Sequence, residues 1–376
     1  MFYNDVCVTT DALAEFISKD DTFEAIVSEV GNIVREGYSS KDYHPLTIEQ
    51  IVSERIPSVR PLGRYPYLEC SEVENVRRGR AGLVRLKSIP VGQRSQKSQE
   101  WLRYRHDHIN ASEASQVFTK SRNALLARKS SPFIGGAEGG GSNATAHGNR
   151  YERVVQMVRE ARCGKAIHEF ESIEHSRLPW LAASPDGVDD DGVMIEIKNP
   201  ITREIVGVPK GEYWIQTQIQ MEVCDLDVCD FIEAKVSEYD GREFYEEDES
   251  VDVLYRGCIV EYDSLITGER VRRYSPLNCR GEALDAWLVE TKAGCEGEMC
   301  DSYEFWWRMT VYSEFRVYRD RFWFQSVLGE FERFWQEVEA HRTNGTATEI
   351  KVKKRVKRAN DAPLQPSQCF LLDEDY

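Results

Sequence analysis

The stretch WLAASPDGVDDDGVMIEIKNP, residues 180–200, constrains the fold of this chain more than any other segment. After the turn signal SPDG, the apolar residues Val193, Ile195 and Ile197 alternate with Met194, Glu196 and Lys198. Successive side chains of a strand point to opposite faces, so Glu196 and Lys198 share the face that the apolar residues leave free. This pattern predicts a β-hairpin with two charged side chains on one face of its second strand.

Helical and strand periods alternate on both sides of this hairpin. Residues 148–161 and 212–226 repeat their apolar positions at helical spacing, and residues 229–239 alternate as a strand. The chain from residue 148 to residue 239 therefore reads helix, strand, strand, helix, strand. That order predicts an α/β fold with a mixed β-sheet flanked by helices.

The flanking regions have different patterns. Residues 11–20 and 22–37 are typical of short amphipathic helices that open on Asp11 and Thr22 as caps. A hairpin is expected within residues 251–276, and residues 302–341 carry aromatic side chains at a spacing that favours helices of the core or of an interface. We expect four regions: a helical N-terminal region with a basic linker (1–92), a core (93–250), a C-terminal hairpin and helices (251–345), and a flexible basic then acidic tail (346–376).

The distribution of charge is more informative than its sum. A net charge of −16 argues against a protein that coats nucleic acid. Yet nine basic residues and only Glu100 as an acid lie between Arg77 and Arg105, and a second basic run spans Lys351–Arg358. Such runs suit either a DNA-facing side or a merely solvated face. The second run is also compatible with a nuclear address.

Two classes of protein are disfavoured. No apolar run approaches the length of a membrane span, and the first residues lack the basic start and apolar core of a signal peptide. We therefore expect an intracellular protein that has no membrane partner.

The hairpin gathers groups that suit phosphodiester hydrolysis. Asp186 lies in the turn before the hairpin, and Glu196 and Lys198 lie on its second strand. Two carboxylates and the backbone carbonyl of Ile197 offer the hard oxygen ligands that Mg²⁺ prefers, and a lysine can orient water and offset developing charge. The alternative for the acidic excess is structural, because the DDDG of residues 189–192 suits a hairpin tip.

The pattern SPDG…EIK resembles the two halves of the PD-(D/E)xK nuclease signature. Three further motifs, EWLRYRHDHINASEAS, GNRYE and YWIQTQIQM, narrow the resemblance to the lambda exonuclease/YqaJ-type viral recombinases, which include viral alkaline exonucleases. All four motifs occur in the family's order within residues 98–240. The resemblance implies a restriction-endonuclease-like core, to which the flanking sequence adds a helical N-terminal region and an aromatic-rich helical C-terminal region.

The resemblance also implies roles for individual residues. Asp186 and Glu196 would be metal ligands and Lys198 the catalytic lysine. Glu152 would be an accessory acid that positions metal or water, and Gln218 would lie beside the site. A surface position on an amphipathic helix is the alternative for Glu152, and a plain polar position on a helix is the alternative for Gln218.

Substrate contacts are implied for three more residues. Arg105 and Ser112 would hold the 5′-terminal phosphate of a DNA strand, and Gln216 would lie near the site. A guanidinium suits phosphate because it donates two parallel hydrogen bonds. Arg105 as a linker cation and Ser112 as a helix cap remain the alternatives.

The implied activity is that of a Mg²⁺-dependent exonuclease, with Mn²⁺ as a substitute. It would digest double-stranded DNA from its ends, 5′ to 3′ with a preference for 5′-phosphate, in recombination or viral genome processing. The alternatives are an endonuclease or RNA-degrading nuclease on the same core, or an inactive DNA-end-binding factor. Implied partners are DNA ends and a single-strand annealing protein, with oligomers possible, in the nucleus or cytoplasm of a host if the protein is viral.

Overall fold

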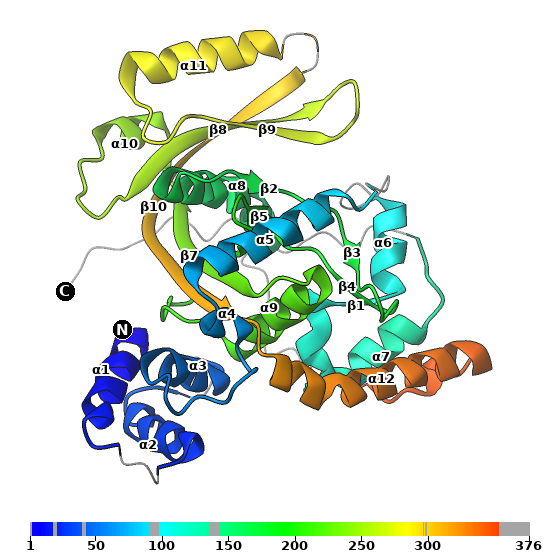
Figure 1. Ribbon diagram of the computed structural model, residues 1–376. Coiled ribbons are helices and arrows are strands. Elements are labelled where there is room, and N and C mark those ends of the chain that lie inside the picture. Colours follow the sequence, from blue (N-terminus) through cyan, green and yellow to red (C-terminus); the bar gives the residue numbers. More distant parts are fainter. Residues whose placement is uncertain are drawn as a thin grey trace, which may run out of the picture.

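A computed structural model describes residues 2–17, 21–39, 43–90, 98–135, 143–295, 297 and 299–352. A seven-stranded mixed sheet in the order β2-β5-β6-β7-β10-β8-β9 runs through the middle of the molecule (Figure 1). Strands β6 and β7 are parallel, and the other neighbours in this sheet are antiparallel. Its strands are β2 (Ile167–His168), β5 (Gly187–Asp189), β6 (Met194–Lys198), β7 (Val228–Glu238), β8 (Tyr255–Ser264), β9 (Arg270–Tyr274) and β10 (Met299–Tyr318).

A second, separate sheet has three short strands. Its order is β1-β4-β3, with β1 parallel to β4 and β3 antiparallel to it. The sheet brings residue 109 next to residue 181, so two of the motifs lie close in space. Its strands are β1 (Ile109–Asn110), β3 (Ile173–Glu174) and β4 (Leu181–Ala183).

Two helices cover opposite faces of the large sheet near the β5–β6 hairpin. On one face, Val154 and Val158 of α8 (Asn143–Cys163) form a buried cluster with Ile195 and Ile197 of β6. On the other face lies α9 (Gly211–Cys224), whose side chains contact Glu196. The expected mixed sheet flanked by helices is confirmed, but five short strands, β2 to β6, lie between α8 and α9 where the sequence predicted two.

The N-terminal helices pack together at one end of the molecule, beside the end of β10 (Figure 1). Thr22 caps α2 as expected, because its hydroxyl accepts from the backbone N–H of Ala25. Asp11 does not cap a helix, since it lies inside α1, and that expectation was wrong. The helices at this end are α1 (Phe2–Ala14), α2 (Phe23–Arg35) and α3 (Leu46–Arg55), and the chain continues through the short α4 (Pro66–Glu69) to α5 (Glu72–Lys87), which lies over the core.

The aromatic segment of residues 302–341 is helical only in its second half, α12 (Arg321–Asn344). The first half forms β10, which pairs with both β7 and β8. Trp306 and Trp307 are buried in different clusters on the two faces of this strand. A strand covered on both faces keeps apolar residues at consecutive positions, which hides the alternation that marks a strand.

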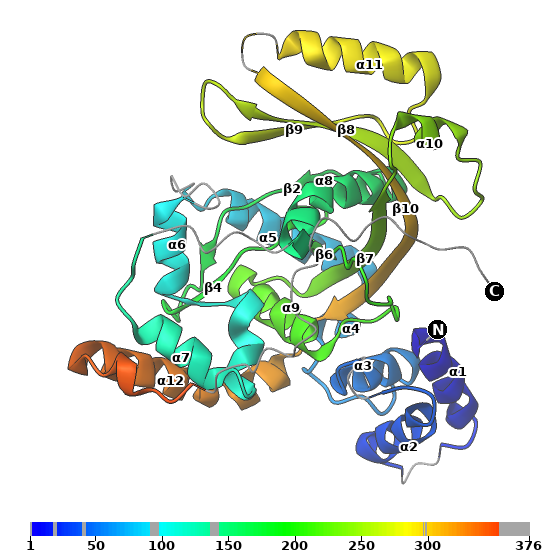
Figure 2. The ribbon, with the colours of Figure 1, turned by 180° about the vertical axis from the view of Figure 1, so that it is seen from behind.

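The β8–β9 hairpin confirms the turn expected within residues 251–276. With α10 (Arg242–Glu247) and α11 (Gly281–Gly294) it forms a lobe at the far end of the sheet, as Figure 2 shows. In the described ranges, no helix combines the length and the apolar character that crossing a bilayer requires. The basic run Lys351–Arg358 lies largely outside the described residues, as does the tail from residue 353 onward.

The remaining elements lie between α5 and α8 or follow α12. They are α6 (Gln99–His106), the 3₁₀ helix η1 (Ala111–Phe118), α7 (Arg122–Ser130) and the 3₁₀ helix η2 (Ala347–Glu349).

Candidate active site

The β5–β6 hairpin brings Asp186, Glu196 and Lys198 together. Gly187 pairs with Ile195 across the hairpin, so Asp186 lies opposite the middle of β6. The Asp186 carboxylate accepts a hydrogen bond of 2.7 Å from the backbone N–H of Ile197. Lys198 donates from Nζ to Oε1 of Glu196. The three side chains therefore meet at the end of the hairpin where β6 leaves the sheet.

Two glutamines of α9 hold Glu196 from the side of the helix. The Nε2 atoms of Gln216 and Gln220 donate to the two different carboxylate oxygens of Glu196, each at 2.7 Å. Residues four apart lie on the same face of a helix, so one carboxylate can accept from both. Gln220 was not singled out from the sequence, although the spacing of four from Gln216 was a usable signal.

Gln218 does not lie at this site, and its expected place beside the catalytic groups is wrong. Its amide donates to the carbonyl of Tyr318 and accepts from the backbone N–H of Asp320, both at 2.8 Å. Position 218 is two residues from Gln216, which places it on another face of α9. Gln218 thus joins α9 to the junction between β10 and α12.

The acids at this site repel each other. Burial, followed by the charges of Glu196 and Glu152, raises the pKa of Asp186 well above its usual range. Burial and the carboxylate of Glu196 raise the pKa of Glu152 to about 7. Burial alone would lower the pKa of Lys198, but the carboxylates of Glu196 and Asp186 raise it overall. One lysine thus faces three carboxyl groups, and the pKa values of two of these are raised.

This arrangement suits a divalent cation. Throughout the described ranges, no three or more His, Cys, Asp or Glu side chains are arranged to hold a metal ion together. Mg²⁺, however, is commonly held by one or two carboxylates, with water and substrate oxygens completing its shell. Asp186 and Glu196 could supply those two carboxylates, and a cation between them would offset the repulsion that raises the pKa of Asp186. The carbonyl of Ile197 stays a predicted third ligand.

A second group of charged residues lies beside Lys198. Lys198 and Arg203 both lie over the ring of Tyr213, with Nζ and Cζ 5.2 and 5.4 Å from its centroid. Arg203 forms an ion pair with Glu233, a buried residue of β7 that is in register with Lys198 of β6. Sequence reasoning missed this group. The alternation of β7 was the available signal, because it places Glu233 on the face of Lys198.

Arg105 and Ser112 come together at a distance from the hairpin. Arg105 is on α6 and donates to the hydroxyl of Ser112, on η1, at 3.3 Å. The guanidinium carbon of Arg105 lies over the ring of Trp101, 4.8 Å from its centroid. Ser98 caps α6, and Glu113 accepts from the backbone N–H of Asn110, so Ser112 is free of the capping role. Both side chains line an open hollow of about 480 Å³.

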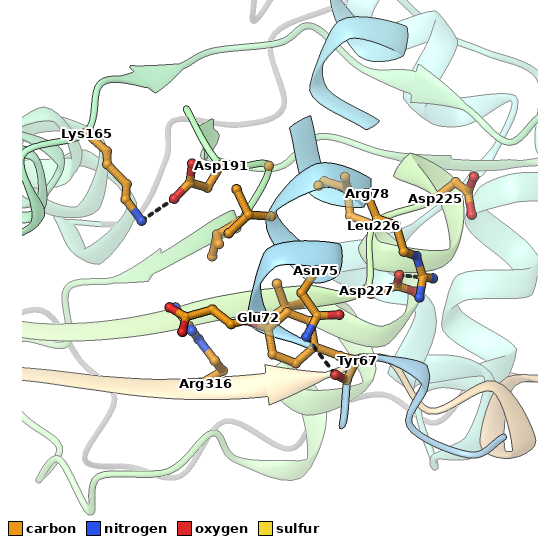
Figure 3. Close-up of a pocket in the computed structure, with 15 residues that line it drawn as sticks. Tyr67, Glu72, Asn75, Arg78, Lys165, Asp191, Asp225, Leu226, Asp227 and Arg316 are labelled. Carbon is orange, nitrogen blue, oxygen red and sulfur yellow. Dashed lines mark hydrogen bonds and ion pairs between the residues drawn. The ribbon is translucent and has the colours of Figure 1, made fainter. Parts of the chain in front are cut away.

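The tip of the hairpin lies against α5, and residues of both line the hollow that is drawn in Figure 3. Gly79 of α5 touches the backbone of the tip so closely that an added Cβ would lie 2.0 Å from the carbonyl oxygen of Asp191. Asp191 also forms ion pairs with Arg80 and Lys165. Gly192 has a φ of +79°, which favours glycine at the turn. A helix far away in sequence therefore fixes this turn.

Several cations of the first basic run form ion pairs with carboxylates of the core, although Arg80 and Arg85 stay exposed. Arg78 pairs with Asp227, Arg80 with Asp191, and Arg85 with Asp225. These ion pairs dock α5 on the core, and a DNA-facing side for the basic run stays a prediction. The acidic residues of 189–191 are turn and docking residues, in agreement with the structural alternative.

Comparison with known sequences adds an independent observation. Residues 100–227 match the family model of the YqaJ-like viral recombinase domain. This segment is similar to the YqaJ-like domain. It contains the hairpin, α9, Glu152 and the hollow at Arg105, whereas α5 and β10 lie outside it.

Sequence similarity to a known protein extends beyond residues 100–227. The chain is 26% identical over 330 residues to an uncharacterized protein, R354, of Acanthamoeba polyphaga mimivirus; the match covers 74% of this chain and 59% of the relative. The chain thus spans about three fifths of that relative's length.

Two solved structures are partly similar. One is the alkaline exonuclease LHK-Exo from Laribacter hongkongensis (TM-score 0.41, 21% identity, 68% of this chain and all of that chain). The other is a phage-related exonuclease from Haemophilus somnus 129PT (TM-score 0.34, 14% identity, 65% of this chain and 96% of that chain).

Proposed function

We propose that the chain is a Mg²⁺-dependent exonuclease that digests double-stranded DNA from its ends. The observation that carries the proposal is the meeting of Asp186, Glu196 and Lys198 at the open end of one hairpin, inside a YqaJ-like domain. A surface hairpin has no structural reason to bury two repelling carboxyl groups beside a lysine, since such burial costs stability.

Each group has a proposed role. Asp186 and Glu196 hold the cation, and Gln216 and Gln220 orient the carboxylate of Glu196 by donating to both of its oxygens. The bound cation would polarise the scissile phosphate and lower the pKa of a water ligand. Lys198 orients the attacking water and offsets charge that develops on the phosphate. Glu152 positions that water from α8. Mn²⁺ is expected to substitute for Mg²⁺.

The direction of digestion is proposed from the hollow at Arg105. Arg105 and Ser112 offer a guanidinium and a hydroxyl to one anionic group, which suits a terminal phosphate. Recognition of a 5′-phosphate there would commit the enzyme to 5′ to 3′ digestion. The proposed setting is recombination or viral genome processing, with DNA ends and a single-strand annealing protein as partners.

Digestion of linear duplex DNA tests the proposal. The substrates carry either a 5′-phosphate or a 5′-hydroxyl, and the proteins are the native chain, Lys198→Ala and Lys292→Ala. Lys292 is a matched control because it forms an exposed ion pair on α11. We expect Mg²⁺-dependent loss of DNA with the native protein and the control, faster on the phosphorylated ends, and none with Lys198→Ala.

Four outcomes would contradict the proposal or part of it. Nicking of closed circular DNA at the rate of linear DNA would indicate an endonuclease. Degradation of RNA in preference to DNA would indicate the other enzyme class on this core. Binding of ends without any cleavage by the native protein would indicate an inactive end-binding factor. Equal rates on both kinds of end would remove the proposed role of Arg105.

A further inference from the structure

The hollow at Arg105 is larger than a phosphate ion requires, and both polar and apolar side chains line it. Its volume, about 480 Å³, falls within the range of sites for small organic ligands. Arg105, Ser112 and Gln116 form a polar wall. The apolar side chains of the lining include Phe133 and Ile134, the latter 86% exposed. An apolar lining of this kind is unnecessary for an anion and suits a group with an apolar face.

A second hollow adjoins the first and shares Phe133 with it. It measures about 400 Å³ and is lined by Arg103, His106 and Arg342, among others. The guanidinium carbon of Arg103 lies 5.3 Å from the centroid of the Phe133 ring, and His106 meets the ring edge-on at 5.6 Å. The Phe133 ring therefore lines two hollows that arginines also line, and it contacts Arg103 and His106.

The charge of this surface is opposite to that of the chain. The chain carries −16, yet no carboxylate of the described residues pairs with Arg103 or Arg105. The one deeply buried acid there, Glu113, is already paired with Lys129 and Arg128. The guanidinium of Arg103 lies against Phe133, and that of Arg105 lines the same hollow as Phe133; neither pairs with a carboxylate of the described residues. Their ligand must be anionic and must also offer an apolar face.

We propose that the two hollows hold the whole 5′-terminal nucleotide of a DNA strand, with its phosphate at Arg105 and its base stacked on Phe133. Aromatic rings next to arginines are the combination that binds unstacked bases, because every base has a π-face and every nucleotide has a phosphate. The inference rests on the proposed function. It extends that function by making the terminal base, and not only the phosphate, part of the ligand.

The test is a binding cycle, carried out in EDTA so that no cleavage occurs. Two fluorescently labelled duplexes carry a 5′-phosphate on a terminal unpaired nucleotide, which is either complete or abasic. Anisotropy gives the affinity of the native protein, Phe133→Ala, Phe133→Leu and the control Phe244→Ala. Phe244 is a matched control because it is a half-exposed phenylalanine on α10, in the other lobe.

The native protein is expected to bind the complete end about tenfold more tightly than the abasic end, as base–aromatic stacking implies. Phe133→Ala should lose about tenfold on the complete end and nothing on the abasic end. Phe133→Leu, which keeps the apolar volume and therefore the fold, should behave in the same way. Phe244→Ala should match the native protein on both ends.

Equal losses on both ends for Phe133→Leu, or no loss on either, would overturn the inference. Its failure differs from failure of the proposed function. Digestion with a 5′-phosphate preference, together with equal losses in the cycle, would remove only the base contact. A base-dependent loss in a protein that never cleaves DNA would keep the base contact and remove the nuclease.

Discussion

The two ends of the β5–β6 hairpin carry acidic side chains in opposite electrostatic environments. At the open end, burial and neighbouring carboxylates raise the pKa of Asp186. At the tip, hydrogen bonds from Lys165 and His168 lower the pKa values of Asp191 and Asp190, respectively. The residues are only a few positions apart in sequence, so the surrounding elements and not the local sequence set these states.

This difference separates two uses of a carboxylate. An acid whose pKa is lowered stabilises the folded state, because the folded protein favours its charged form. An acid whose pKa is raised by other acids costs stability, and such a cost persists where function requires it. The open end therefore has the character of a site, and the tip has the character of a joint. Each variant below acts on one end and should leave the other unchanged.

Asp186→Asn should have the largest effect. We expect digestion of linear DNA to fall by about 100- to 1,000-fold, because a charge that acts on the transition state is lost. In EDTA the same variant should melt at a higher temperature than the native protein, because the amide removes the repulsion from Glu196 and can still accept from Ile197. A lower melting temperature, or native activity, would contradict this assignment of the open end.

Gly79→Ala should have the next largest effect, on stability. The new methyl group would meet the carbonyl oxygen of Asp191 at 2.0 Å, so α5 or the turn must move. We expect urea unfolding to show a loss of about 1–3 kcal/mol in the free energy of unfolding. Gly329→Ala on α12 is the matched control, since its nearest neighbour would be 3.8 Å away. An equal effect of both variants would show that α5 does not fix the tip.

Asp191→Asn should have a smaller effect of the same kind. It removes ion pairs to Arg80 and Lys165, which are partly exposed cations, so we expect a loss of about 0.5–1 kcal/mol. Digestion per folded molecule should stay at the native rate, in contrast to Asp186→Asn. A loss of activity as large as that of Asp186→Asn would mean that the tip acids belong to the site.

The smallest effect should be the pH dependence of the difference in unfolding free energy between the native protein and Asp191→Asn. The folded-state pKa of Asp191 lies below its unfolded value of about 3.9, so its contribution is fully present above that pH and is lost as the pH falls through the folded pKa. The gap in unfolding free energy between the native protein and Asp191→Asn should therefore be constant at pH 5 to 6 and should narrow toward pH 3. Urea titrations at several pH values measure it, and a gap that widens in acid would refute the sign.

The hairpin and its helices were predictable because their signals are local. Period-2 alternation identified β6, and the chain order around it indicated a mixed sheet. The alternation also placed Glu196 and Lys198 on one face, as the structure has them. Gln218 was misplaced because a motif gives residue types and spacing, whereas the direction of each side chain depends on how α9 is rotated on the sheet.

The parts that sequence reasoning missed depend on long-range contacts. The approach of Gly79 to the turn joins residues more than a hundred positions apart, and no local pattern marks it. The ion pairs of the α5 arginines could not be predicted, because their carboxylate partners, such as Asp227, are distant in sequence. Strand β10 was misread because both of its faces are covered.

The position of β10 also has a consequence for the order in which the chain can fold during synthesis. It pairs with β7 on one side and with β8 on the other, although both are complete some 35 residues or more before it begins. Until residues 299–318 leave the ribosome, these two strands keep open edges that other chains could pair with. Completion of the sheet is therefore a late event in translation, and a stalled ribosome would leave an aggregation-prone chain.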